Sequence, residues 1–259
     1  MIQAIIYVLH SWKYSPLQTY LAFALSLLLI LPYVWYWTRK SGVNHWLAVL
    51  ALFSGLVTVS VCIYLEYFFP HDYWYWALAE ESLKLGILFI YIYLFRIDRT
   101  KIVTYGILIA LGFAFFENAL FVLQPLSESM SSAGLMLINR YMGATNLHIL
   151  TTGMISLAIS QYYSSKQSRI FLILVPVYFV TSVVLHFGFN SLVSGNSVIW
   201  YAFAIIWFFS LLFVCLKYSY DISVNHEEFQ YSKLSKSIYL YASIGIGVPL
   251  VASYFISIV

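Results

Sequence analysis

The chain has 259 residues, of which 62% are hydrophobic and only 9% are charged. Because soluble domains carry about 25% charged residues, this composition excludes an ordinary soluble protein and indicates a membrane protein. The small formal charge of +3 and the lack of a long Lys/Arg run exclude a nucleic-acid partner. Two cysteines, Cys62 and Cys215, lie in separate apolar segments, so neither a disulfide framework nor a CxxC metal site is expected.

Long apolar segments follow one another along the whole chain. Since a helix needs about 20 apolar residues to cross a bilayer, the sequence predicts an all-α, polytopic membrane protein with about eight transmembrane helices. The expected spans lie at about 17–38, 45–69, 74–95, 102–123, 140–162, 169–193, 197–217 and 237–259. The longest connections, about 124–139 and 218–236, leave no room for a soluble domain, so residues 1–259 are predicted to form a single integral membrane domain.

Lys and Arg residues fall almost entirely on alternate connections between these spans. One face of the membrane collects Arg39, Lys40, Arg96, Arg99, Lys101, Lys166, Arg169, Lys217, Lys233 and Lys236. The opposite face has only Lys13 and Arg140. Because cytoplasmic loops are enriched in Lys and Arg, we expect a multi-pass protein of the plasma (cell) membrane with both termini extracytoplasmic.

Four of the expected helices, the third to the sixth, carry ionisable or amide side chains in their interiors. These residues are Glu80, Glu81 and Lys84 in 74–95, Glu117 and Asn118 in 102–123, His148 in 140–162, and His186 and Asn190 in 169–193. A charge near a helix centre costs roughly 2.5–3.5 kcal/mol on insertion scales, so such groups are expected to face the bundle interior and to pair. Lys84 is close enough in the helix to reach Glu80 or Glu81.

The depth of these residues indicates one shared site. Counted from the outer ends of their helices at 1.5 Å per residue, the glutamates and histidines all lie roughly 9–12 Å below the outer membrane boundary. A proton path across the membrane would instead spread polar groups through its whole thickness. We therefore predict an intramembrane polar site on the third to sixth helices.

Some of these residues also have purely structural interpretations. The Glu81–Lys84 pair could serve only to hold helices together, and Asn118 is expected to hydrogen-bond between helices. Arg140 either supports the site or is a snorkelling anchor at the boundary. Outside the site, an interfacial position is expected for Glu66, and bonds to helical carbonyls are expected for Thr151 and Thr152.

The residue types of the cluster suit hydrolysis without a Ser or Cys nucleophile. A glutamate can activate water as a general base, and a histidine with a neighbouring Asn can stabilise the developing oxyanion. No GxSxG sequence is present. The same groups could instead bind a divalent metal that activates water, with Glu81, Glu117, His148 and His186 as candidate ligands, although HExxH is absent.

At these residues the sequence resembles the PrsW family of intramembrane proteases, which is related to the type II CAAX prenyl endopeptidases and the Abi proteins. The segment 80–84, EESLK, resembles the family's EExxK motif, and 113–117, FAFFE, resembles its FxxxE motif. His148 stands where a third-motif histidine is expected, and 186–190, HFGFN, resembles the final HxxxN element. Lys84 and Glu117 replace the Arg and His of the CAAX branch, which favours PrsW. The resemblance covers the core 74–193.

The resemblance implies proteolysis of single-pass membrane proteins, such as anti-sigma factors, near the extracytoplasmic side of the bilayer. We predict a glutamate-dependent endopeptidase in which Glu80 or Glu81 activates water. The assisting residues are predicted to be Glu117 and His148 for proton movement, His186 and Asn190 for the oxyanion, and Lys84, Asn118 and Arg140 in support. No cofactor is predicted.

Two alternatives remain beside this prediction. One is a metal-dependent hydrolase of protein or lipid that uses the same residues with a divalent metal such as zinc. The other is a non-enzymatic, proton-coupled transporter, because intramembrane Glu, Lys and His residues also form proton relays. The sequence indicates the lipid bilayer as surroundings and does not define an oligomeric state.

Overall fold

The computed structural model describes residues 14–69, 72–164 and 169–194, and every regular element in these ranges is helical. The elements are α2 (Pro16–Ser41), α3 (His45–Glu66), α4 (Tyr73–Phe95), η2 (Arg99–Lys101), α5 (Ile102–Glu128), α6 (Met130–Arg140), η3 (Tyr141–Thr145), α7 (Asn146–Ser164) and α8 (Arg169–Ser194). The predicted spans 197–217 and 237–259, and both chain termini, lie outside the described residues.

Five helical stretches in the described part of the chain are long and apolar enough to cross a membrane. They are Pro16–Arg39, His45–Glu66, Arg99–Glu128, Met130–Tyr163 and Ile173–Ser191. The 23-residue helix α4 is of similar length, but its interior carries Glu80, Glu81 and Lys84. The described part of the chain is therefore all-helical and has the long apolar helices of an integral membrane protein, and the first six predicted spans each coincide with helical structure.

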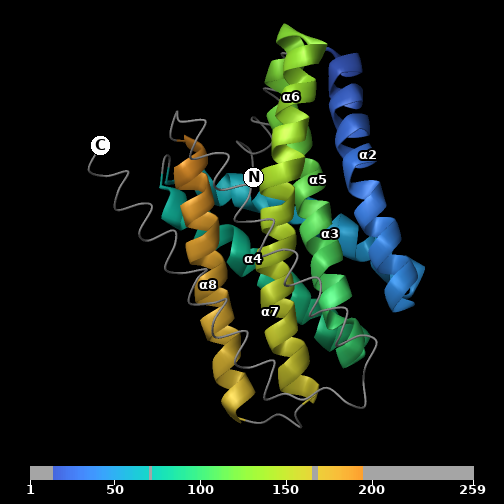
Figure 1. Cartoon of the computed structure of the whole chain (residues 1–259), viewed down its shortest axis with the longest axis vertical. Coiled ribbons are helices and arrows are strands. Elements are labelled where there is room, and N and C mark those ends of the chain that lie inside the picture. Colours follow the sequence, from blue (N-terminus) through green and yellow to red (C-terminus); the bar gives the residue numbers. More distant parts are fainter. Residues whose placement is uncertain (1–13, 70–71, 165–168, 195–259) are drawn as a thin grey trace.

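Helix α5 is the centre of the bundle. It packs against α2, α3, α4, α6 and α7, and its residues from Ile102 to Ala114 are all buried. In Figure 1, α2, α5, α7 and α8 run roughly along the long axis of the molecule, with α7 between α5 and α8. Helix α7, which carries His148, therefore contacts both α5 and α8. These two helices and α4 carry the other predicted site residues.

Glycines allow α3 and α5 to approach each other backbone to backbone. A Cβ atom added to Gly55 of α3 would overlap the carbonyl oxygen of Ile109, and one added to Gly112 of α5 would overlap the carbonyl oxygen of Leu52. Small residues at helix contacts are a common means of packing helices in lipid, where no hydrophobic force drives them together. The α3–α5 contact is thus apolar and is set by the absence of two side chains.

The connection expected at 124–139 is wrong, because this segment is almost entirely helical. Helix α5 continues through Pro125 to Glu128, and α6 begins again after a single extended residue, Ser129. The Ser129 hydroxyl oxygen accepts a hydrogen bond from the backbone N–H of Ser132, which caps the new helix. Buried Ala133 and Leu137, four residues apart, hold α6 in the core cluster formed with α2 and α5.

Helices α6 and α7 form one continuous rod through η3, which is a π-helical turn. The expected start of a helix at 140 therefore falls inside a helical stretch that runs from Met130 to Tyr163. The π turn lies directly before the helix that carries His148. Turns of this type are rare and are frequently found at functional sites.

Candidate active site

Glu81 and Lys84 form an ion pair in the interior of α4. The Lys84 Nζ atom lies 2.7 Å from Glu81 Oε1, and both side chains are completely buried. Of the two carboxylates that the spacing allowed, Lys84 therefore pairs with the one three residues away. Because removing such charges from water is costly, the pair needs further polar partners to persist.

Those partners come from α7 and α8 and converge on the same carboxylate oxygen. Glu81 Oε1 accepts hydrogen bonds from His186 Nδ1 at 2.8 Å and from the Thr151 hydroxyl at 3.1 Å. The Ser182 hydroxyl of α8 donates in turn to the backbone carbonyl of Thr151 at 3.0 Å. The other oxygen, Glu81 Oε2, is buried and has no hydrogen-bond partner among the described residues. One oxygen of Glu81 is thus fully engaged, and the other is available.

His148 lies between Lys84 and Glu117. Its Nδ1 atom is 3.1 Å from Lys84 Nζ, and its Nε2 atom is 2.8 Å from Glu117 Oε2. Since a lysine ammonium can only donate, Nδ1 accepts in this contact, and the ring proton on Nε2 is donated to Glu117. This pattern of partners assigns one tautomer to His148.

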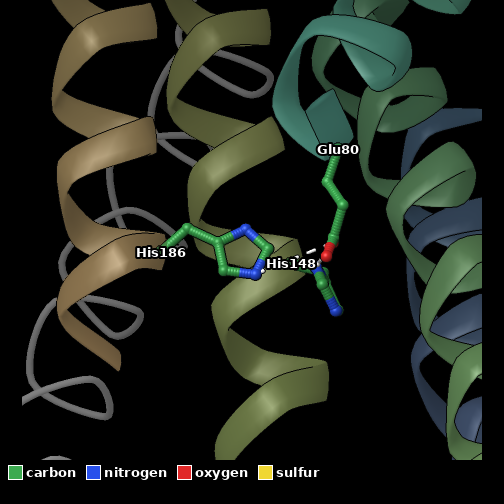
Figure 2. Close-up of side chains that lie close together, drawn as sticks. All are labelled: Glu80, His148 and His186. Atoms are coloured by element: carbon green, nitrogen blue, oxygen red, sulfur yellow. Dashed lines mark ion pairs between the residues drawn. The ribbon is translucent and has the colours of Figure 1, made fainter. Parts of the chain in front are cut away.

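Glu80 faces both histidines. Figure 2 shows the three side chains pointing toward one another from α4, α7 and α8. Glu80 Oε2 lies 3.6 Å from His186 Nε2 and 4.0 Å from His148 Nδ1, and it has no hydrogen-bond partner in the described part of the chain. One ligand atom from each of the three residues lies within 4.8 Å of the others, a grouping that could hold a metal ion.

Each histidine uses its second ring nitrogen to bind a carboxylate. His148 Nε2 faces Glu117, and His186 Nδ1 faces Glu81, while the remaining nitrogens face Glu80. Metal-binding histidines commonly donate their other N–H to a carboxylate, which fixes the ring and its tautomer. The geometry therefore groups Glu80 with the two histidines as candidate ligands and puts Glu81 and Glu117 behind them. The sequence suggested Glu81 and Glu117 as candidate ligands beside the two histidines.

Glu117 and Asn118 of α5 connect the cluster to the end of α6. The guanidinium of Arg140 forms an ion pair with Glu117 Oε2, and Arg140 Nε donates to Asn118 Oδ1 at 2.8 Å. The Asn118 amide also donates to the Thr145 hydroxyl at 2.8 Å. Arg140, only 13% exposed, thus pairs with site residues and is not a free anchor, and Asn118 bonds between helices as expected.

Four residues of this arrangement were not assigned to the site from the sequence, and one of them is Thr145, which bonds to Asn118. Thr151 does contact a carbonyl of its own helix, at 3.4 Å, but it also donates to Glu81. Ser182 had no distinguishing signal, because a serine in a helix usually bonds within its own helix. Glu66, expected at the interface, is half-buried at the end of α3 and lies near Glu80.

The charges of the cluster do not balance. Four carboxylates (Glu66, Glu80, Glu81 and Glu117) face two cations (Lys84 and Arg140), which leaves a formal excess of two negative charges. A buried excess of this kind is costly unless protons or a cation compensate it. The unpartnered oxygen of Glu80, the two histidine nitrogens and the excess charge together suit a divalent cation.

Asn190 lies one turn beyond His186 on α8 and is half-buried. Its contribution to an oxyanion site remains a prediction. The other predicted site residues, from Glu80 to His186, are joined by the contacts above.

A bundle of apolar helices around buried carboxylates and histidines defines an integral membrane protein with acid–base groups in the interior of its helical bundle. Comparison with known families matches residues 43–216 to the PrsW family of intramembrane metalloproteases. The chain belongs to this family and is an intramembrane protease, a hydrolase of peptide bonds. No curated protein and no solved structure matches it.

Proposed function

We propose that this protease is a metal-dependent endopeptidase that cleaves single-pass membrane proteins near the extracytoplasmic side of the cell membrane. The observation that carries the proposal is the shared orientation of the two histidines. Each directs one ring nitrogen to Glu80 and donates the other N–H to a carboxylate, as metal-binding histidines do.

Glu80, His148 and His186 would hold the metal. A divalent ion such as zinc, when bound there, would act as a Lewis acid and lower the pKa of a bound water. Three protein ligands with a position left for water are typical of catalytic zinc sites. Lys84 donates a hydrogen bond to His148 Nδ1 in the structure. With a metal on that nitrogen, Lys84 would keep its ion pair with Glu81.

Glu81 is proposed as the general base. Its Oε1 atom is held by Lys84, Thr151 and His186, so the carboxylate cannot rotate freely, and its buried Oε2 atom is available to take a proton from water. Fixed orientation of a base within hydrogen-bonding reach of its proton is the first requirement of general base catalysis. Asn190 is proposed to stabilise the oxyanion.

Glu117 and Arg140 are proposed to keep His148 in the tautomer that leaves Nδ1 free of a proton. Glu117 accepts the Nε2 proton, and Arg140 neutralises Glu117. The extracytoplasmic position is supported by the distribution of Lys and Arg, which places the outer ends of α4 and α8 close to the cluster.

Metal content and cleavage test this proposal together. Purified protein in detergent is expected to contain stoichiometric zinc, and removal of the metal by a chelator should abolish cleavage of a co-reconstituted single-pass membrane protein. Glu80→Gln should lose the metal, and Glu81→Gln should retain it while cleavage falls by about 10²–10⁴-fold. Glu128→Gln is the matched control, because Glu128 is exposed at the end of α5.

A glutamate-dependent mechanism without metal is the second candidate, and the hydrogen bond between Lys84 and His148 Nδ1 favours it because that nitrogen is already engaged. It predicts full cleavage by metal-free protein and loss of cleavage in Glu80→Gln and Glu81→Gln alike. Wild-type cleavage by both glutamine variants would contradict both mechanisms.

A further inference from the structure

The π turn before His148 is closed by a buried amide. The Asn146 Nδ2 group donates to the backbone carbonyls of Tyr141 at 3.0 Å and Met142 at 3.1 Å, two groups inside the widened turn. Asn146 itself is completely buried. Its side chain therefore adds hydrogen bonds to the backbone of the π turn.

A second helix fixes the Asn146 side chain. The Tyr33 hydroxyl of α2 donates to Asn146 Oδ1 at 2.8 Å, and the Tyr33 and Tyr141 rings lie 5.7 Å apart. All three hydrogen bonds of this amide are thus directed at α2 and at the π turn. Helix α2 lies outside residues 43–216, so this contact comes from a part of the chain that the family match does not include.

The π turn decides which face of the rod His148 occupies. At 3.6 residues per turn, each residue rotates the helix by about 100°. Two residues eight apart in a regular helix therefore point in directions that differ by about 80°. One residue accommodated in a π turn reduces this offset to about 20°. Arg140 and His148 are eight residues apart, and both contact Glu117 Oε2. The widened turn thus brings Arg140 and His148 close to one face of the rod, the face on which both contact Glu117.

We infer that Asn146, held by Tyr33, is a positioning residue that keeps the π turn formed and thereby places the His148 imidazole against Lys84, Glu117 and Glu80. The inference rests on the proposed function, because it assumes that His148 belongs to the site. Asn146 touches no reacting group and acts only through the backbone that precedes His148.

Zinc affinity measured by competition with a chromophoric chelator tests the inference on the full-length protein in detergent. Asn146→Ala is expected to weaken zinc binding by about 10-fold or more, as loss of supporting groups around metal sites commonly does. Tyr33→Phe, which removes a single hydroxyl, should weaken binding a few-fold at an unchanged unfolding temperature. Tyr20→Phe is the control, since Tyr20 is on the same helix and is 74% exposed.

Cleavage kinetics supply the second measurement. A displaced His148 should lower kcat with little change in KM, whereas simple loss of folded protein would lower the unfolding temperature and the active fraction. Wild-type zinc affinity and kcat in Tyr33→Phe and Asn146→Ala, with zinc binding lost in His148→Ala, would overturn the inference and leave the metal centre standing.

If His148→Ala and Glu80→Gln bind zinc like the wild type, the metal centre is refuted. The kcat values of Tyr33→Phe and Asn146→Ala then decide the inference alone. A fall in kcat in these two variants supports it, and unchanged values overturn it.

Discussion

The two sides of α5 are packed by opposite means. Toward α3, Gly55 and Gly112 bring two backbones into direct contact through apolar surface. Toward α7, Glu117 and Asn118 reach His148 and Thr145 through hydrogen bonds. In lipid both means can join helices, but only polar contacts select particular atoms as partners. The difference suggests a division in which the α3 side contributes mainly stability and the α7 side also sets the geometry of the proposed active site.

The largest effect is expected from Lys84→Met on the polar side. This change leaves the buried Glu81 carboxylate without its cation, which should lower the free energy of unfolding by about 3–5 kcal/mol and abolish cleavage. The double variant Lys84→Met/Glu81→Leu should regain much of that stability while remaining inactive. Unfolding in detergent and cleavage of a membrane substrate are the two measurements. Cleavage by the double variant would show that the Lys84–Glu81 pair contributes to stability alone and has no role in the reaction.

A methyl group added at the apolar contact between α3 and α5 should lower stability and leave cleavage unchanged. Gly112→Ala forces the added Cβ against the Leu52 backbone, so we expect a loss of about 1–3 kcal/mol in the free energy of unfolding with normal cleavage per folded molecule. Gly86→Ala and Gly134→Ala are matched controls, because nothing lies within 4 Å of a Cβ at either position. These controls should be neutral or stabilising by up to about 1 kcal/mol. Equal losses in all three variants would show that helix propensity, and not close approach, is being measured.

A smaller effect is expected where α8 contacts α7. Ser182→Ala removes the hydrogen bond to the Thr151 carbonyl and should reduce the free energy of unfolding by about 1 kcal/mol, with a modest fall in kcat because Thr151 also holds Glu81. Thr181→Val is the control, since within the described ranges the Thr181 hydroxyl bonds to Val177 of its own helix. A control with the same fall in kcat would argue against a role for the α7–α8 bond.

Asp98, on the exposed connection between α4 and η2, provides a reference outside both packing faces. Its carboxylate accepts the Thr100 backbone N–H at 2.8 Å, which holds the pKa of Asp98 below its usual value. The stabilisation is therefore present above pH 4 or so and is lost as the pH falls through the lowered pKa. Asp98→Ala should cost about 0.5 kcal/mol at neutral pH. Unfolding curves of both proteins should converge in acid, and a constant difference would exclude the capping interaction.

Charge and periodicity in the sequence were sufficient to predict most of the helices that the described residues form. Ionisable residues such as Glu81 and His186 stand out in an apolar chain, and the structure brings these two side chains into contact. Their common depth in a membrane stays a prediction. The sequence did not reveal Ser182 or the π turn, because neither changes the local hydropathy. The helix at 130–140 was missed since its Ser and Gly residues favour loops, and only burial of Ala133 and Leu137 against α2 and α5 makes it helical.

The length of the α6–α7 rod bears on how water reaches the site. Its 34 residues span about 51 Å at 1.5 Å per residue, well beyond the roughly 30 Å of a bilayer's hydrocarbon core. With Tyr162 and Tyr163 as an aromatic anchor at one interface, the hydrocarbon would begin close to residue 144 on the other side. His148 would then lie only about one helical turn, roughly 6 Å, below that boundary, which is shallower than the roughly 9–12 Å expected from the sequence. Water could then reach the site through a shallow dip in the membrane surface beside α6. A channel through the bilayer would not be needed.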